Sequence, residues 1–154
     1  MNYWLLKTEP DSFSVADFAK LPRQTTGWDG VRNYQARNTL RDSMKVADEA
    51  FIYHSSCDTP GIAGIARVVR AGYPDATAFD KRHPHYDAAS DPAKPRWYMV
   101  DVQLARRMKR VITLEELRQH AARELRALPL LRAGNRLSVT PVGTAEWRFI
   151  LTLE

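Results

Sequence analysis

Short strand-like segments occur near both ends of this chain, and regular helices do not separate them. The candidate strands are Tyr3–Lys7, Ala50–His54, Ile62–Val69, Trp97–Leu104 and Leu137–Val139. A doubly wound parallel sheet needs a crossover helix between successive strands, and that alternation is missing here. The sequence therefore predicts an α+β fold, in which about five to six strands form a mixed sheet that curls into a small barrel surrounded by short helices.

Small polar residues mark the starts of four predicted helices. Each can accept a hydrogen bond from a backbone amide in the first helical turn. The four capping residues are Ser14, Asn33, Thr113 and Thr144. The helix after Asn33 is expected to reach Met44, and further helical structure is expected over Leu125–Leu131. No repeat or linker interrupts the sequence, so residues 1–154 are predicted to form a single domain.

Length and composition exclude several classes of protein. The chain has 154 residues, of which 44% are hydrophobic and 27% are charged, so it can bury a core. No apolar run approaches the roughly 18–20 residues that span a bilayer, and the first residues lack the basic leader of a secretion signal. Cys57 is the only cysteine, which excludes an internal disulfide and a cysteine-based zinc site. We expect a cytosolic monomer without membrane contact.

Positive charge is concentrated in the last third of the chain. Residues 1–102 contain 13 Lys or Arg and 13 Asp or Glu, whereas residues 103–154 contain 10 and 5. The densest run is Arg106-Arg107-Met108-Lys109-Arg110. Such a run can hold the phosphate backbone of a nucleic acid. It can equally be the solvated face of a helix in a basic protein.

The segment Trp28–Arg37 has the composition of a ligand site. It places an aromatic ring, a flexible Asp-Gly turn and several hydrogen-bonding groups just before a helix. Trp28 can stack on a flat ring, which contributes about 1–3 kcal/mol per base in single-strand binders, or it can anchor the core. Because turn residues flank Trp28, we expect it to be less buried than Trp4 or Trp147.

The neighbours of Trp28 have alternative roles. Asp29 can accept hydrogen bonds from the edge of a base, or it can serve only as a turn residue. Arg32 can contact phosphate or support an acidic loop. We interpret Asn33 as a helix cap and not as a ligand-binding residue.

Polar residues also follow two of the predicted strands. Lys7 and Glu9 share one face if their strand continues that far, so they form either an acid/base pair with shifted pKa values or a salt bridge that closes the strand end. Ser55 directly follows another strand, and Trp97 begins a third. Strand ends meet at one rim of a barrel, so these residues and Trp28 can line one pocket.

The histidines and serines give weak signals for metal binding or catalysis. His83 and His85 lie in the long segment 72–96, near Asp80 and Asp87, but no zinc motif is present. We interpret them as loop residues and expect no metal or other cofactor. The residues around Ser55 do not form a nucleophile elbow. A loop as long as 72–96 is usually functional or packed over another part of the domain.

Five segments resemble the motifs of the EVE domain family. They are Tyr3–Pro10, Trp28–Asn38, Phe51–Ser55, Gly61–Gly64 and Pro95–Trp97. The motifs cover essentially the full chain in the order that the family has them. The resemblance implies a PUA-like fold, related to the YTH domains that read methylated adenine with an aromatic cage. It also implies binding of modified bases in DNA or RNA.

The resemblance further implies roles for individual residues. Trp28 and Trp97 would be walls of a base pocket. The residues near its rim or floor would be Lys7, Glu9, Asp29, Tyr34 and Ser55. The charge pattern, and not the resemblance, suggests the residues that would hold the nucleic-acid backbone: Arg32, Arg106, Arg107, Lys109 and Arg110, within a basic region that extends over residues 106–136.

Three functions are compatible with these observations. The leading hypothesis is a non-enzymatic reader that takes a flipped or single-stranded modified base into the pocket. The alternative is a hydrolase of modified nucleosides. ASCH domains share the PUA-like fold, and some hydrolyse a modified nucleoside with Lys, Thr and Glu residues, which Lys7, Thr8 and Glu9 supply. A third hypothesis is a protein-interaction module that uses the 72–96 loop.

Overall fold

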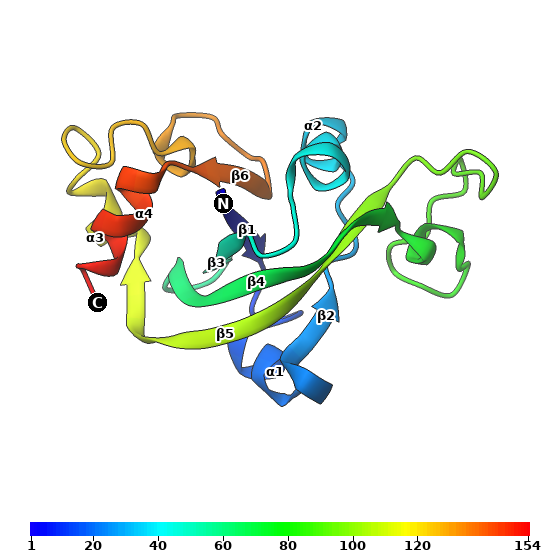
Figure 1. Cartoon of the computed structure of the whole chain (residues 1–154), viewed down its shortest axis with the longest axis horizontal. Coiled ribbons are helices and arrows are strands. Elements are labelled where there is room, and N and C mark those ends of the chain that lie inside the picture. The colour runs from blue at the N-terminus through cyan, green and yellow to red at the C-terminus, as the bar shows by residue number, and fades with distance from the viewer.

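The computed structural model describes all 154 residues and contains one six-stranded sheet (Figure 1). Its strands are β1 (Tyr3–Thr8), β2 (Thr25–Gly27), β3 (Glu49–His54), β4 (Gly61–Pro74), β5 (Tyr98–Thr113) and β6 (Val139–Val142). Their order across the sheet is β2-β5-β4-β3-β1-β6. β1 pairs with β3 in parallel, and all other neighbours are antiparallel. The predicted α+β fold with a mixed sheet is therefore confirmed.

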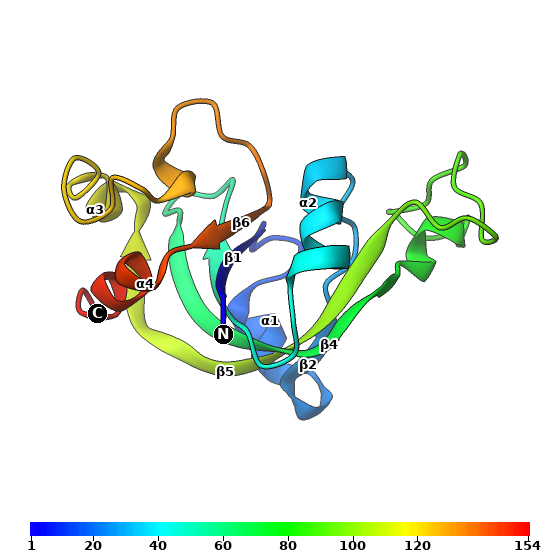
Figure 2. The same ribbon diagram turned by 45° about the horizontal axis from the view of Figure 1, so that its top comes forward.

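β4 and β5 form a long antiparallel ribbon that bends around the rest of the molecule. Figure 2 shows this ribbon curving beneath β1 and α2. Its register shifts at several positions, among them Ile62/Gly64 and Val68/Arg70, and such bulges bend a strand and increase its twist. The sheet curls as a barrel does, but β2 and β6 at its edges are not paired with each other, so it stays open.

Four short α-helices connect or follow the strands. They are α1 (Val15–Lys20), α2 (Tyr34–Asn38), α3 (Leu114–Arg118) and α4 (Thr144–Leu151). The side chains of Ser14, Asn33 and Thr113 accept amide hydrogen bonds in the first turns of α1, α2 and α3, as predicted. The prediction for Thr144 is wrong, because Gly143 is the capping residue of α4 and no side chain caps that helix. None of the helices has the length and apolar composition of a membrane span.

Shorter helical turns complete the fold. They are η1 (Pro22–Gln24), η2 (Thr39–Ser43), η3 (Ala76–Phe79) and η4 (Pro129–Leu131). The helix that was expected to reach Met44 ends as an α-helix at Asn38 and continues as the π-helical turn η2. Of the helical segment expected over 125–131, only η4 forms a helical turn, and Pro129 begins it.

The strand expected to end at Leu104 continues to Thr113, so the basic run lies on β5 and not on a helix face. The buried residues of this extension are Met108 and Ile112. Charged side chains occupy most of the other positions, which hides the strand pattern in the sequence. Pairing with β4 along this length supplies the backbone hydrogen bonds that hold the segment extended.

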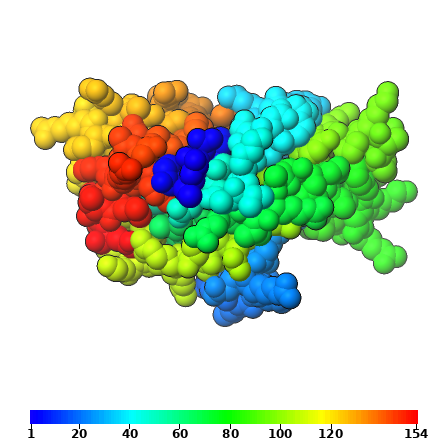
Figure 3. All heavy atoms as spheres, viewed as in Figure 1, coloured from blue at the N-terminus to red at the C-terminus, as the bar shows by residue number.

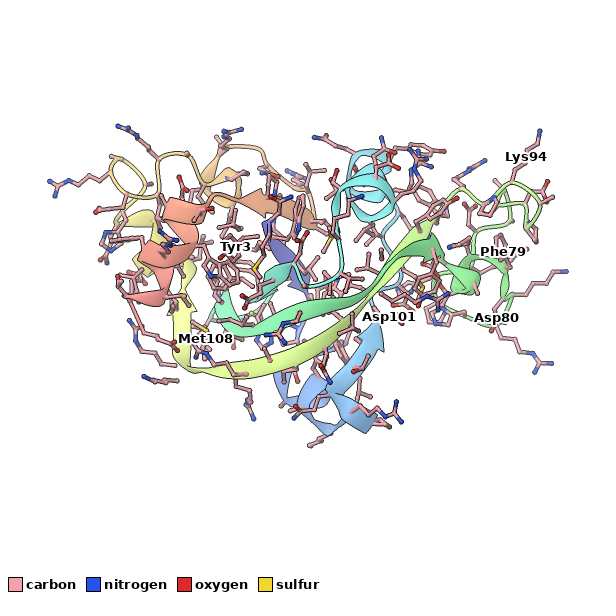
Figure 4. All side chains as sticks on the ribbon, in the orientation of Figure 1. Tyr3, Phe79, Asp80, Lys94, Asp101 and Met108 are labelled. Atoms are coloured by element: carbon pink, nitrogen blue, oxygen red, sulfur yellow. The ribbon has the colours of Figure 1, made fainter.

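The two faces of the sheet bury two separate hydrophobic clusters. Trp4 and Leu6 of β1 belong to one cluster, and Leu5 belongs to the other, because successive side chains of a strand point to opposite faces. Tyr3, which Figure 4 labels, stacks on Trp147 of α4 with 4.4 Å between ring centroids. The sphere view shows the N-terminal and C-terminal segments side by side on one face (Figure 3).

The segment between β4 and β5 projects from one end of the molecule. Phe79, Asp80 and Lys94 mark it at the right of Figure 4. A hydrogen bond closes its base, because the Asp75 amide donates over 2.9 Å to the carbonyl of Trp97, the residue before β5. This loop brings its histidines back toward the start of the chain, where they form one wall of the cavity described next.

Candidate functional site

A cavity with a volume of about 480 Å³ lies where the end of β1 meets the turn after β2 and the projecting loop. Most of its lining residues are polar, and Phe13 and Trp28 supply its two large apolar side chains. The lining residues are Lys7, Thr8, Glu9, Ser12, Phe13, Thr26, Gly27, Trp28, Asp29, Gly30, His83 and His85. We call this cavity the base pocket, after the ligand that the family resemblance implies. Its size and its mixture of aromatic and polar groups suit a small, flat, polar ligand.

Trp28 lines the base pocket and also anchors the core. Its exposed fraction is 7%, equal to that of Trp4, so the expectation that turn residues would leave Trp28 less buried is wrong. The reason lies in the backbone, since the Trp28 amide donates to the Val100 carbonyl over 2.8 Å and continues the alignment of β2 with β5. The indole packs against Phe13 and Phe18, with centroids 6.1 and 6.4 Å away. Both roles considered for Trp28 are therefore compatible with its position.

A buried carboxylate fixes the turn that follows Trp28. One oxygen of Asp75 accepts hydrogen bonds from the Gly30 amide at 2.9 Å and from Arg32 at 3.0 Å. The other oxygen accepts from the amide and hydroxyl of Thr77. Burial alone would raise the pKa of Asp75, but these bonds and the Arg32 charge lower the pKa below its usual value. Arg32 thus supports an acidic loop, which was one of the two roles considered for it.

The same contacts position the histidines of the projecting loop. Arg32 donates to the carbonyl of His85 over 2.6 Å. Gly30 has a positive φ of 77°, and a side chain at this position would overlap the His85 imidazole. The glycine is therefore required both by its backbone conformation and by the close approach of His85.

Asp29 faces both histidines. Its Oδ2 atom lies 3.7 Å from Nε2 of His83 and 3.6 Å from Nδ1 of His85. The ligand atoms of the three residues all lie within 4.8 Å of one another, a spacing that a metal ion could occupy. However, Nδ1 of His83 accepts the His85 amide at 3.0 Å, which places the proton of the neutral ring on Nε2. A metal needs that nitrogen without its proton, so His83 suits hydrogen-bond donation toward Asp29.

Lys7, Thr8 and Glu9 all line the base pocket, but they do not form the pairs that the sequence suggested. Lys7 and Glu9 form no salt bridge. Partial burial lowers the pKa of Lys7, and no charged partner opposes this effect. The Thr8 hydroxyl donates to the Phe13 carbonyl over 2.7 Å and closes the turn after β1.

The structure does not bring the other predicted pocket residues into this cavity. Trp97 stacks on Tyr34 with 5.0 Å between centroids, and its indole nitrogen donates to Asp87 over 2.6 Å. Trp97 lines a separate hollow with Arg32 and His85. Ser55 lines a neighbouring cavity that shares only Lys7 with the base pocket. The expectation that Trp97 forms a second wall beside Trp28 therefore does not match the geometry.

The basic run of β5 is partly neutralised within the chain. Arg106 pairs with Glu154, and Arg110 pairs with Glu116 at 2.7 Å. The side chains of Arg107 and Lys109 are exposed and form no ion pair. Two of the five residues expected to hold a nucleic-acid backbone thus have carboxylate partners, and a third, Arg32, has Asp75.

Sequence reasoning missed several residues of the pocket. Phe13 and Thr26 were not singled out from the sequence, and His83 and His85 were interpreted as loop residues. Asp75, which holds the turn after Trp28 but does not line the pocket, was also missed. The one available signal was the length of the 72–96 segment, which indicated that it packs over another part of the domain. Its partner could not be named, because the contact with Gly30 spans 45 positions of sequence.

Comparisons with known proteins agree with this architecture over the whole chain. The family model of the EVE domain matches residues 2–153. Mouse thymocyte nuclear protein 1 is 51% identical over 167 residues, which cover 99% of this chain and 74% of that protein.

Solved structures extend the comparison to three dimensions. Human THYN1 in complex with 5-methylcytosine containing DNA superposes with a TM-score of 0.94 and 46% identity, covering 99% of this chain and 97% of that one. An ASCH protein from Zymomonas mobilis, at 12% identity, a TM-score of 0.57 and 99% coverage of both chains, shares the fold alone. The chain therefore belongs to the EVE domain family.

Proposed function

We propose that this protein holds a modified base of a nucleic acid in the base pocket and does not alter it chemically. The observation that carries the proposal is the juxtaposition of Trp28 and Phe13 with the Asp29 carboxylate around a cavity of about 480 Å³. The similarity to human THYN1, whose structure contains 5-methylcytosine DNA, supports the same class of ligand. That similarity favours DNA over RNA as the nucleic acid that is bound.

The chemistry of the pocket suits a methylated cytosine. The exocyclic amine of cytosine is a hydrogen-bond donor, and a carboxylate such as Asp29 accepts from it. Thymine presents a carbonyl oxygen at the same position, which the Asp29 carboxylate would repel. The methyl group of the base can lie against Phe13 and Trp28, which are the apolar part of the lining. The pocket thus offers a hydrogen-bond acceptor to the amine of the base and an apolar contact to its methyl group.

Reading a base in a duplex requires the base to leave the stack. This step costs a few kcal/mol, and stacking on an aromatic side chain returns about 1–3 kcal/mol. Hydrogen bonds in the pocket and contacts with the nucleic-acid backbone must supply the rest of the free energy that base flipping costs. Single-stranded oligonucleotides carrying the modified base should therefore bind more tightly than the matched duplexes.

The contacts of Thr8 favour a reader over the hydrolase alternative. A nucleophilic hydroxyl needs a neighbouring base that takes its proton. The Thr8 hydroxyl donates instead to the Phe13 carbonyl, which cannot act as that base. Incubation of the protein with modified nucleosides, followed by mass spectrometry, is expected to show no change of mass.

Fluorescence anisotropy tests the reader directly. Three matched single-stranded oligonucleotides carry 5-methylcytosine, cytosine or thymine at one position. The wild type is expected to bind the 5-methylcytosine strand most tightly. Asp29→Asn is expected to reduce the preference over thymine by about 1–3 kcal/mol, because the amide adds a donor where only an acceptor stood. Equal affinity of the wild type for all three strands would refute the proposal.

The stacking role of Trp28 needs a conservative variant. Trp28→Ala would empty a core position and cost about 3–5 kcal/mol of stability, so weaker binding could follow from unfolding. Trp28→Phe keeps an aromatic ring and is expected to weaken binding while the protein stays folded. Trp97→Phe is the matched control, since Trp97 lies outside the base pocket. Its affinity for the 5-methylcytosine strand should equal that of the wild type.

A further inference from the structure

Two hollows beside the base pocket are lined by cations and by no carboxylate. The first contains Lys7, Arg118 and Arg132 and has a volume of about 340 Å³. The second contains Arg132 and Arg136 and has a volume of about 470 Å³. Each hollow is open to solvent, and neither has an Asp or Glu residue in its wall.

Shared residues connect the base pocket with both hollows. Lys7 lines the base pocket and the first hollow. The segment 132–135 lines the first and the second hollow. The three cavities are thus neighbours that share wall residues, and we call the two cavities beyond Lys7 the basic groove. The groove ends beside Asn33 and Gln35 at the start of α2.

The cations of the basic groove have no partner within the chain. The arginines that pair with a carboxylate are Arg32, Arg41, Arg96, Arg106 and Arg110, and none of these lines the groove. Arg118, Arg132 and Arg136 are exposed. Lys7 is half-buried, and burial lowers its pKa because no anion compensates for the lost water. An anion bound beside Lys7 would supply the missing partner.

Neutral donors add to this surface. Tyr53 lines the first hollow. Burial raises the pKa of Tyr53 despite the opposing charge of Arg118, so its hydroxyl keeps its proton and can donate a hydrogen bond. Gly134 adopts a positive φ of 75° at the exposed tip of the 132–135 segment, and nothing lies within 4 Å of the place where a side chain would stand. A backbone can approach this tip closely.

We propose that the strand carrying the recognised base leaves the base pocket at Lys7 and follows the basic groove, where Arg118, Arg132 and Arg136 neutralise its phosphates. This inference rests on the proposed function, because it places the backbone relative to the pocketed base. It replaces the expectation that the basic run of β5 holds the backbone, since Arg106 and Arg110 already pair with Glu154 and Glu116.

The salt dependence of oligonucleotide binding tests the groove with matched variants. Arg132→Gln combined with Arg136→Gln removes two charges from the groove. Arg107→Gln combined with Lys109→Gln removes two unpaired charges from β5 and serves as the control. Affinities for single strands with and without 5-methylcytosine are measured by fluorescence anisotropy between about 50 and 200 mM salt. Thermal unfolding verifies that both double variants are folded.

The groove predicts a specific pattern. Each lost phosphate contact lowers the slope of log affinity against log salt concentration by about 0.7 for a single strand, so the groove variant should lose about 1.4 units of slope. The preference for 5-methylcytosine should persist, and the β5 control should keep the wild-type slope. Arg118→Gln is an independent single variant with an expected loss of about 0.7.

The two proposals fail in different ways. An unchanged slope in the groove variants, or a reduced slope in the β5 control alone, overturns the proposal that the strand follows the groove. The proposal that the protein reads a modified base is not affected by this result. A wild type without preference for 5-methylcytosine overturns the reader, and a reduced slope in the groove variants would then show that the groove binds backbone without base selection. Absence of any oligonucleotide binding overturns both proposals.

Discussion

The Gly30 amide donates a hydrogen bond of 2.9 Å to the buried carboxylate of Asp75, which stands 45 positions later in the chain. This bond joins the turn that holds Trp28 and Asp29 to the loop that holds His83 and His85. Arg32 strengthens the junction with an ion pair to the same oxygen at 3.0 Å. The base pocket therefore depends on one carboxylate that does not itself line it.

Asp75→Asn is expected to destabilise the protein and to loosen the base pocket. The amide cannot form the ion pair with Arg32, and the two donors that bond to the oxygen replaced by the NH2 group lose their acceptor. The free energy of unfolding should fall by about 2–4 kcal/mol, as measured by urea denaturation. Asp91→Asn is the control, because Asp91 is exposed and accepts only the amide of Ala93. Equal stabilities of the two variants would contradict the role of Asp75.

The lowered pKa of Asp75 also predicts acid sensitivity. The folded state holds this carboxyl ionised more strongly than the unfolded state does. Its contribution to stability is therefore fully present above the ordinary carboxyl pKa of about 3.9 and is lost as the pH falls through the lower folded value. Urea denaturation below about pH 4 should show a smaller acid-induced loss in Asp75→Asn than in the wild type. An equal acid-induced loss of stability in the two proteins would contradict the assignment of this acid sensitivity to Asp75.

Gly30→Ala is expected to cost more stability than Gly134→Ala. Both glycines have a positive φ, 77° and 75°, so each substitution carries about 1–2 kcal/mol of backbone strain. Only at Gly30 would the new methyl group also overlap the His85 ring. Thermal or urea unfolding of the two variants measures the difference. A smaller loss for Gly30→Ala than for Gly134→Ala would show that His85 does not pack on Gly30.

His54 is expected to make stability depend on pH between neutral and mildly acidic conditions. Its Nε2 atom accepts the Val15 amide at 3.0 Å, at the start of α1. Burial, assisted by the charge of Arg107, lowers the pKa of His54. The unfolded chain therefore takes up the proton first, so stability is complete above about pH 6.5 and falls as the pH drops toward the folded pKa.

A variant that lacks the titrating imidazole of His54 isolates its contribution to the pH dependence of stability. His54→Gln keeps an acceptor for the Val15 amide but cannot be protonated in this range. The decrease in unfolding free energy from about pH 7.5 to 5.5 should be smaller in His54→Gln than in the wild type. An equal decrease in both proteins would assign the pH dependence to other groups.

Local patterns were sufficient to predict most elements of the fold. The alternation and bulk of Tyr3–Lys7 and Ala50–His54 identified β1 and β3, and the polar residues Ser14, Asn33 and Thr113 identified three helix starts. These signals come from residues that lie within a few positions of one another in the chain, so they can be read from one sequence. β2 has only three residues and Gly27 among them, so it forms because β5 offers a pairing edge and not because of its own propensity.

The base pocket could be predicted only in part, because its walls are far apart in sequence. Trp28, Asp29, Lys7 and Glu9 were found from local composition and from the family resemblance. His83 and His85 were placed in a loop, because the sequence does not show which part of the domain that loop packs against. Trp97 was expected beside Trp28, but its bond to Asp87 and its stacking on Tyr34 hold it in another hollow.

The central claim is that the base lies against Trp28 and not against Trp97. The indole N–H resonances of the four tryptophans, assigned with single Trp→Phe variants, report on each ring separately in a ¹H–¹⁵N spectrum during titration with a strand that carries 5-methylcytosine. The Trp28 resonance is expected to shift, while those of Trp4, Trp97 and Trp147 stay in place. A shift of the Trp97 resonance with no change at Trp28 would contradict the account.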